Sequence, residues 1–217
     1  MERDDDILIK LSDVSAGYEG VTILSDVNIT VRSSSFIALV GPNGGGKTTL
    51  VRLMLGQIDA MSGELFRRKN LRIGYLPQIN DIDMEFPITV EDVIFSGVPC
   101  LFRHTEEERR RADELIRFAG LEELRSRQIG RLSGGQRQRA FLCRALMNNP
   151  QLLMLAEHSP YLDRDASTGL YALLDKLKNE MAIVLVSHDI DSTSHRARTI
   201  YRVERNVRLV ANHYIIK

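Results

Sequence analysis

Residues 36–52 read Phe-Ile-Ala-Leu-Val-Gly-Pro-Asn-Gly-Gly-Gly-Lys-Thr-Thr-Leu-Val-Arg, and this stretch decides the fold. Its first five residues are apolar and predict a buried strand, and the residues from 49 to 55 favour a helix. A strand, a glycine-rich turn ending in Gly46-Lys47-Thr48 and a helix form the pattern of a phosphate-binding loop. Glycines let successive backbone N–H groups turn inward around an anion, and the helix directs its positive end at the same anion. We therefore interpret Lys47 as a charge for the β- and γ-phosphates of a nucleotide, and the Thr48 hydroxyl as a ligand for Mg²⁺.

The composition narrows the class of protein. The 217 residues are enough for one α/β domain, or for a core with a small appendage. The 29 basic residues are balanced by 29 acidic ones, which argues against a nucleic-acid-binding protein with a basic field. Cys100 and Cys143 have no metal-ligand spacing, so we expect a reducing, cytosolic setting.

The sequence contains no evident membrane-directed segment. The first six residues, Met1 to Asp6, include four acidic ones and do not resemble a signal peptide. No apolar run approaches the roughly 20 residues that a membrane span needs. We therefore expect this chain to reach a membrane only through a partner.

Short aliphatic segments on both sides of the loop predict additional strands. Residues 7–11 and 27–31 predict an antiparallel layer ahead of the loop, with a turn at 15–20 between them. After the loop and its helix, residues 63–66 and 71–78 predict two further short strands.

Residues 79–130 predict a helical block inserted into the α/β core. Thr89 begins a helix with the spacing of a capping box, and a second helix is expected from Thr105 to Phe118. We expect the three arginines at 109–111 to face solvent. Four residues of the second helix recur at helical spacing and are expected to be buried: Ala112, Leu115, Ile116 and Ala119.

A second candidate anion site follows the helical block. Residues 132–136, Leu-Ser-Gly-Gly-Gln, precede a helix that we expect over 137–147. A serine cap and two glycines at a helix N-terminus leave N–H groups that can bind an anion. In isolation this would be an ordinary serine cap, but beside a phosphate-binding loop it indicates a second cradle for one nucleotide chemistry.

The C-terminal part of the chain predicts the rest of an α/β sheet. Residues 152–155 and 182–187 are continuous apolar runs, as expected of buried parallel strands, and residues 166–179 favour a helix between them. Residues 198–203 and 207–210 are expected to be short closing strands. Buried strands that alternate with helices predict a mostly parallel sheet with helices on both faces.

The order of these motifs resembles the nucleotide-binding subunit of ATP-binding-cassette (ABC) transporters, over about residues 7–210. Tyr18 matches the aromatic A-loop position, where we expect adenine to stack. Residues 41–50, 89–97 and 136–146 look most like the ATPases of zinc and manganese importers. Six motifs of the family follow in order: Gly41-Pro-Asn-Gly-Gly-Gly-Lys-Thr48 (Walker A), Gln78 (Q-loop), Leu132-Ser-Gly-Gly-Gln136 (signature), Glu157 (end of Walker B), Leu162-Asp163 (D-loop) and His188 (switch histidine).

The resemblance implies a single domain, residues 1–217, with a phosphate-loop NTPase core and an N-terminal antiparallel β layer. The core would comprise residues 1–78 and 131–217, with the helical subdomain at 79–130 inserted in it. It also implies a head-to-tail homodimer with ATP and Mg²⁺ between two copies. One copy would bind the nucleotide through Tyr18, Gly41, Asn43, Gly44, Gly45, Gly46, Lys47, Thr48 and Thr49, and the other through Ser133, Gly134, Gly135, Gln136 and Asp163.

The resemblance also implies catalytic roles and partners. Glu157 would polarise the attacking water, His188 would contact the γ-phosphate, and Lys47 would neutralise phosphate charge. Gln78 would help to hold Mg²⁺ and would report nucleotide state to the helical block, which docks on a membrane permease. An extracytoplasmic substrate-binding protein would be an indirect partner, and the chain would sit on the inner face of the cell membrane.

The sequence departs from the family at the end of Walker B, where Asp-Glu-Pro is expected and Ala156-Glu157-His158 stands. Alanine cannot ligate Mg²⁺, so Thr48 and Gln78 would carry more of that role. If the missing Asp acts through water, its loss costs roughly 10–100-fold in metal affinity or activity.

Three readings of this departure stay open: a weak or regulatory ATPase, an engineered or degenerate substitution in an ordinary enzyme, and a shift of Glu157 onto the metal. His158 is either a base or a loop residue where the family has proline. The functional alternatives are a transport ATPase for a divalent metal, a non-hydrolysing ATP-dependent switch, and an ABC protein acting on DNA or ribosomes. The balanced charge and the lack of tandem cassettes argue against the last of these.

Overall fold

The computed structural model describes residues 6–77, 86–99, 103–156, 164–187 and 196–212. It begins with a long hairpin of strands β1 (Ile7–Tyr18) and β2 (Val21–Arg32), joined by only two residues. Both turn residues have positive φ, 50° at Glu19 and 81° at Gly20, as in the tight turns whose twist matches paired strands. The strands predicted at 7–11 and 27–31 are confirmed within β1 and β2, but both are longer than predicted. The turn predicted at 15–20 is confined to Glu19 and Gly20, because residues 15–18 continue β1.

The hairpin belongs to a three-stranded antiparallel sheet with the order β2-β1-β4, where β4 is Ser62–Arg67. This sheet is the antiparallel layer that the sequence predicts, and β4 adds a third strand to it from beyond the phosphate loop. The close pairing of β1 and β2 depends on Gly17, since a Cβ there would lie 1.9 Å from the carbonyl oxygen of Val21.

A six-stranded sheet forms the centre of the molecule, in the order β5-β6-β7-β3-β8-β9. All neighbouring pairs are parallel except β8 and β9, which confirms the prediction of a mostly parallel sheet. The strands are β3 (Phe36–Val40), β5 (Ile73–Leu76), β6 (Leu152–Leu155), β7 (Ala182–Ser187), β8 (Thr199–Glu204) and β9 (Asn206–Asn212).

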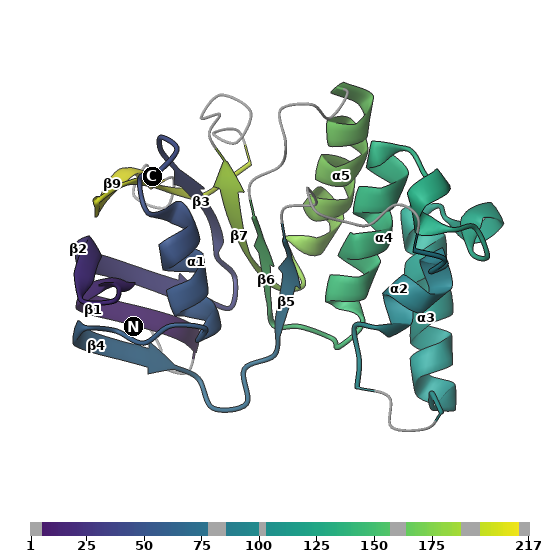
Figure 1. Cartoon of the computed structure of the whole chain (residues 1–217), viewed down its shortest axis with the longest axis horizontal. Coiled ribbons are helices and arrows are strands. Elements are labelled where there is room, and N and C mark those ends of the chain that lie inside the picture. The colour runs from purple at the N-terminus through teal and green to yellow at the C-terminus, as the bar shows by residue number, and fades with distance from the viewer. Residues whose placement is uncertain (1–5, 78–85, 100–102, 157–163, 188–195, 213–217) are drawn as a thin grey trace.

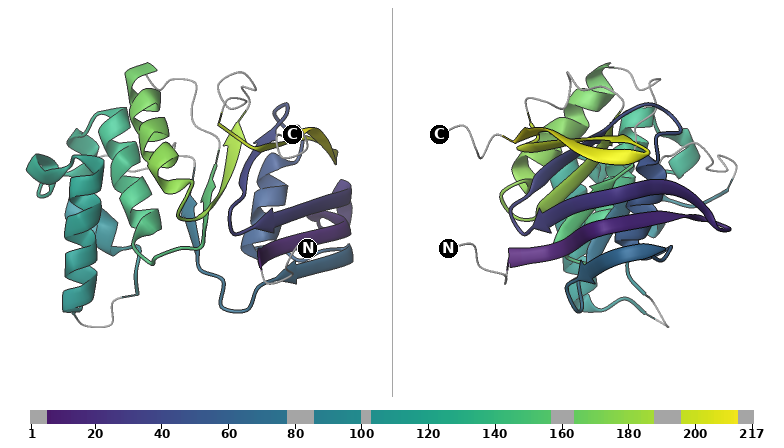
Figure 2. Two further views of the ribbon diagram at one scale, coloured as in Figure 1. Left: turned by 180° about the vertical axis from the view of Figure 1, so that it is seen from behind. Right: turned by 90° about the vertical axis from the view of Figure 1, so that its left-hand side faces the viewer.

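Helices cover both faces of this sheet, as Figures 1 and 2 show. Helix α1 (Lys47–Leu55) lies between one face and the antiparallel sheet, and helices α4 (Gly134–Leu146) and α5 (Arg164–Leu177) lie on the other face. Strand β3 is buried on both sides: Ile37 and Leu39 pack in the cluster that contains α1, and Phe36, Ala38 and Val40 in the cluster that contains α4. Successive side chains of a strand point to opposite faces of the sheet, so this one strand contributes to both hydrophobic cores.

The helical block consists of α2 (Val90–Phe95), α3 (Glu106–Ala119) and two short 3₁₀ turns, Glu122–Leu124 and Ile129–Arg131. Both predicted helix starts are confirmed, since Thr89 and Thr105 each form a capping box. The four apolar positions predicted in α3 are buried in the same cluster as α4 and α5. Of the three arginines at 109–111, the first two are exposed and Arg111 is half-buried, so the prediction of a solvated face holds for two of them.

Helix α4 begins three residues earlier than predicted, because Ser133 caps it and both glycines of the Leu-Ser-Gly-Gly-Gln motif form its first turn. Within the described residues, none of the helices has the length and apolar character of a membrane span.

Candidate functional site

The predicted phosphate-binding loop connects β3 to α1, as the sequence pattern requires. Its backbone packs closely against strand β8: a Cβ on Gly41 would lie 2.2 Å from the carbonyl oxygen of Val203, and a Cβ on Gly45 would lie 2.6 Å from it. Gly41 also has a φ of 152°, which L side chains rarely adopt. Both glycines are therefore required by the fold of the loop.

Lys47 places a positive charge against this loop. Its side chain is buried, with 5% of its surface exposed, and Nζ donates hydrogen bonds to the carbonyl oxygens of Gly41 (2.7 Å) and Pro42 (3.0 Å). A buried ammonium needs such partners, and an anion at the loop would provide another.

The N-terminus of α1 adds the partial positive charge of its backbone. The N-cap residue Gly46 gives no side-chain hydrogen bond, and the first turn of α1 contains no acidic residue. The first N–H groups therefore lack the side-chain cap that α2, α3 and α4 each have, which leaves them suited to a phosphate. Thr48 is exposed in this turn, whereas Thr49 is buried with 5% of its surface exposed.

Tyr18, at the end of β1, lies beside α1. Its hydroxyl accepts a hydrogen bond of 3.3 Å from Nη1 of Arg52, and the guanidinium carbon lies 5.9 Å from the centre of the tyrosine ring. A cation and an aromatic ring at this separation attract each other. Arg52 thus orients the ring next to the helix that follows the loop, a contact that sequence reasoning missed because nothing in the sequence links these two positions.

The second anion motif lies on the other side of the central sheet. Ser133 Oγ accepts from the N–H of Gln136 at 3.3 Å, and the Ser133 N–H donates to Oε1 of Gln136 at 3.0 Å. Both α1 and α4 have their N-termini at the edge where the parallel strands end, but they pack in separate hydrophobic cores on opposite faces (Figure 1). The two anion motifs of one chain therefore do not converge on one nucleotide.

The other predicted site residues, Gln78, Glu157, Asp163 and His188, lie outside the described residues. The strands that precede three of them end side by side, because Val40 is paired with Ser187, Leu155 with Leu185, and Leu76 with Leu155. Ala156 follows β6, is half-buried, and donates its N–H to the carbonyl oxygen of Leu76 at 2.9 Å.

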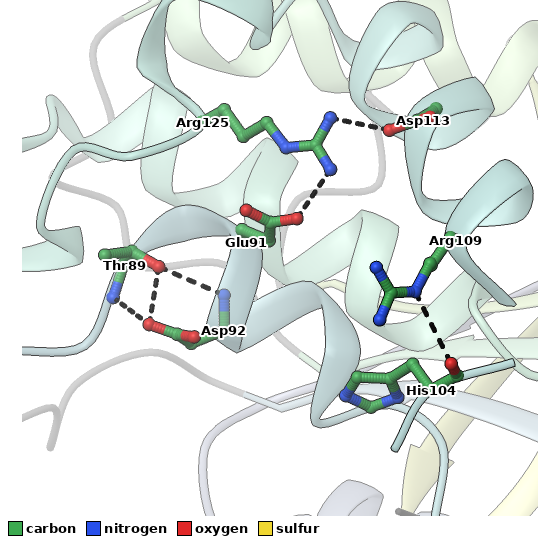
Figure 3. Close-up of polar contacts among 7 residues, drawn as sticks. All are labelled: Thr89, Glu91, Asp92, His104, Arg109, Asp113 and Arg125. Carbon is green, nitrogen blue, oxygen red and sulfur yellow. Dashed lines mark hydrogen bonds and ion pairs between the residues drawn. The ribbon is translucent and has the colours of Figure 1, made fainter. Parts of the chain in front are cut away.

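The helical block contains a separate pocket of about 590 Å³ between α2 and α3. Arg125 forms ion pairs with Glu91 of α2 and Asp113 of α3, so one guanidinium links both helices (Figure 3). These two carboxylates raise the pKa of Arg125 above its ordinary value, Glu91 having the largest effect. His104 is stacked on Phe95 at the edge of this pocket, with ring centres 4.0 Å apart.

Comparisons with known proteins identify the family. Residues 24–159, which include the loop, the helical block and the capped helix α4, match the family model described as ABC transporter. The chain belongs to the ABC transporter family. A relative called the zinc import ATP-binding protein ZnuC, from Alcanivorax borkumensis, is 38% identical over 204 residues, which are 92% of this chain and 76% of that protein.

Solved ABC structures confirm the predicted fold. The chain is similar to cbiO1 from Clostridium perfringens, part of the ABC transporter complex cbiONQ, with a TM-score of 0.83 and 25% identity over 97% of this chain and 90% of that one. It is also similar to dimeric MJ0796, a bacterial ABC transporter cassette, with a TM-score of 0.77 and 27% identity over 94% of this chain and 98% of that one. The chain is thus the ATP-binding subunit of an ABC transporter.

The packing of the loop on β8 generates a prediction. Gly45→Ala places a Cβ 2.6 Å from the Val203 oxygen, so the loop must shift and its N–H groups lose their alignment. We expect ATP affinity, measured by equilibrium binding, to fall by roughly tenfold or more, about 1.4 kcal/mol. Gly169→Ala is the matched control, because a Cβ there has no neighbour within 4 Å and its ATP affinity should stay at the wild-type value. Unchanged affinity in Gly45→Ala would contradict the role assigned to the loop.

Proposed function

We propose that this ABC subunit hydrolyses ATP to drive the import of a divalent metal ion, with zinc as the best supported ion. The proposal of ATP hydrolysis rests on the phosphate loop. Buried Lys47 donates hydrogen bonds to two carbonyl oxygens of this loop, and the N-terminus of α1 has no side-chain cap. The proposal of zinc rests on the relative named as a zinc import ATP-binding protein, at 38% identity.

Each half of the site has a separate task in this proposal. On the loop side, the N–H groups that follow Gly41 bind the β- and γ-phosphates, Lys47 neutralises their charge, and Tyr18 packs against the base. These tasks need positioning and electrostatic stabilisation, which are the main requirements of phosphoryl transfer. The remaining contacts to the nucleotide come from Asn43, Gly44, Gly45, Gly46 and Thr49.

Magnesium fits this loop through its oxygen donors. The exposed hydroxyl of Thr48 is a hard oxygen ligand of the kind that Mg²⁺ prefers, and Gln78 supplies a second such oxygen. When bound, Mg²⁺ neutralises phosphate charge. Among the described residues no cluster of three His, Cys, Asp or Glu could hold a metal ion, and Ala156 adds no oxygen where the family has Asp.

Restoring the missing carboxylate tests whether Ala156 lowers the rate of ATP hydrolysis. We expect Ala156→Asp to raise Mg²⁺-dependent ATP turnover roughly 10–100-fold. This is the typical effect of a carboxylate that bonds to the ligands of a metal ion rather than to the ion itself. Glu157→Gln in the same background is the control and should abolish the gain, because it removes the group that polarises water. Steady-state phosphate release measures both. Equal turnover with Ala156 and with Asp would refute this reading, and an absence of turnover in both would favour a nucleotide-dependent switch.

We also propose that two copies assemble head to tail, so that Ser133, Gly134, Gly135, Gln136 and Asp163 of one copy complete the site of the other. The support is geometric, since α1 and α4 begin at the same edge of the sheet but on opposite faces. A site completed only when two copies close would couple ATP chemistry to movement.

A mixing experiment tests this arrangement. Lys47→Ala disables the loop and Ser133→Arg obstructs the capped helix, so each variant alone should show little ATPase activity. In a mixed dimer, the intact loop of one copy meets the intact Ser133 of the other, and one complete site forms. We expect activity to reappear on mixing in proportion to the fraction of mixed dimers. If the mixture stays as inactive as its components, the head-to-tail proposal is wrong.

The helical block is the proposed surface for a membrane permease, with Gln78 as the connection to the nucleotide. The pocket between α2 and α3 lies on this block, and Arg125 holds its two helices together. Docking there would place the chain on the inner face of the cell membrane, with a substrate-binding protein as an indirect partner.

Metal uptake by cells tests the identity of the solute. Deleting the gene should reduce the initial rate of zinc uptake at low external zinc, and the wild-type chain should restore it. The Lys47→Ala chain is the control and should not restore uptake. A selective loss of manganese uptake would replace zinc by manganese, and unchanged uptake of both metals would exclude an importer of either.

A further inference from the structure

A second pocket, of about 560 Å³, lies at the opposite end of helix α1 from the phosphate loop. We call it the amino-edge pocket, because it lies where strand β5 begins. Its polar lining consists of Gln57, Arg67, Asn70, Arg72, Tyr75 and Asn148. The nine residues of α1, at about 1.5 Å each, separate this pocket from the loop by roughly 13 Å. It is therefore distinct from the site for ATP.

The amino-edge pocket contains two guanidinium groups and no carboxylate. Arg67 donates from Nη2 to the carbonyl oxygen of Leu53 (3.1 Å), and Arg72 donates from Nε to that of Asn149 (2.8 Å). Neither arginine forms an ion pair with any residue in the described ranges. The Nε of Arg67 is buried and has no hydrogen-bond partner among those residues. Because this atom has almost no exposed surface, a ligand in the pocket would meet the terminal nitrogens of Arg67 and Arg72 instead.

The remaining lining suits an anion attached to a polar organic group. Gln57, Asn70 and Asn148 provide amide donors and acceptors without adding charge, and Leu55, Leu71 and Ile73 provide apolar surface. Tyr75 adds a phenol O–H, which is a donor at neutral pH, and burial raises its pKa further although nearby Arg52 opposes the rise. The pocket is open to solvent, and Gln57, Asn70, Arg72 and Asn148 are exposed, so a charged group can reach it directly.

We propose that the amino-edge pocket binds a small phosphate-bearing ligand, with the phosphate shared by Arg67 and Arg72. A phosphate monoester carries nearly two negative charges at neutral pH, which two guanidinium groups would neutralise. The planar fork of each arginine also matches pairs of phosphate oxygens. The site requires neither ATP hydrolysis nor a transported metal, so it stands independently of the proposed function.

Calorimetric titration of the full chain with ribose 5-phosphate, and with uncharged ribose, tests the proposal. We expect ribose 5-phosphate to bind and ribose to show no heat of binding. Arg72→Gln and Arg67→Gln should each weaken binding by roughly tenfold or more, as expected for lost charge-assisted hydrogen bonds. Arg68→Gln is the matched control, because Arg68 bonds the Ile7 carbonyl and is not part of the lining. The control should bind like the wild type.

Two further experiments, one with a Lys47→Ala variant and one with lipid vesicles, identify the site and the source of the phosphate. Binding should persist in Lys47→Ala, since the probe does not use the phosphate loop, and loss there would overturn the proposal. Sedimentation with phosphatidylglycerol vesicles but not phosphatidylcholine vesicles, abolished by Arg72→Gln, would support the site and assign its phosphate to a lipid headgroup. The proposal would be refuted if neither ribose 5-phosphate nor phosphatidylglycerol vesicles bind. It would also be refuted if binding is the same in the Arg67→Gln and Arg72→Gln variants as in the wild type.

Discussion

Burial of strand β3 on both faces is the constraint on which the rest of the structure depends. Alternate residues of this strand pack into two different hydrophobic cores, one containing α1 and the antiparallel sheet, the other containing α4, α5 and the helical block. A strand in that position must be apolar along its whole length, as residues 36–40 are. The phosphate-binding loop starts where this strand ends, so a strand buried on both faces positions the first residue of the loop.

The loop depends on a neighbour that is remote in the sequence. Gly41 and Gly45 both lie against the carbonyl oxygen of Val203, and Arg205 donates its N–H to the carbonyl oxygen of Gly45. The phosphate loop thus packs against strand β8 and the residue that follows it, and Lys47 donates hydrogen bonds to two carbonyl oxygens of the loop itself. Glycines in a phosphate loop are usually explained by the close approach of the ligand. In this chain Gly41 and Gly45 are already required by the packing of the loop against Val203.

The sequence predicted regular features well and local geometry less well. Capping boxes at Thr89 and Thr105, the buried stripe of α3 and the apolar parallel strands were all readable, because each depends on residues that are close in sequence. The turn of the hairpin was predicted too long and its strands too short, because the polar and small residues before Tyr18 resemble a loop. Their pairing with β2 on one side and β4 on the other overrides that local preference.

The sequence by itself determined the phosphate loop, the mostly parallel α/β class and the family, since spacing, glycines and apolar period are local properties. It also predicted both candidate anion motifs. Only the tertiary structure decided that these motifs lie on opposite faces of the sheet, that Arg52 orients Tyr18, and that two arginines meet in a pocket without a carboxylate. The physical reason is that these relations depend on which strands become neighbours, and neighbours in a sheet are chosen by packing between segments that are distant along the chain.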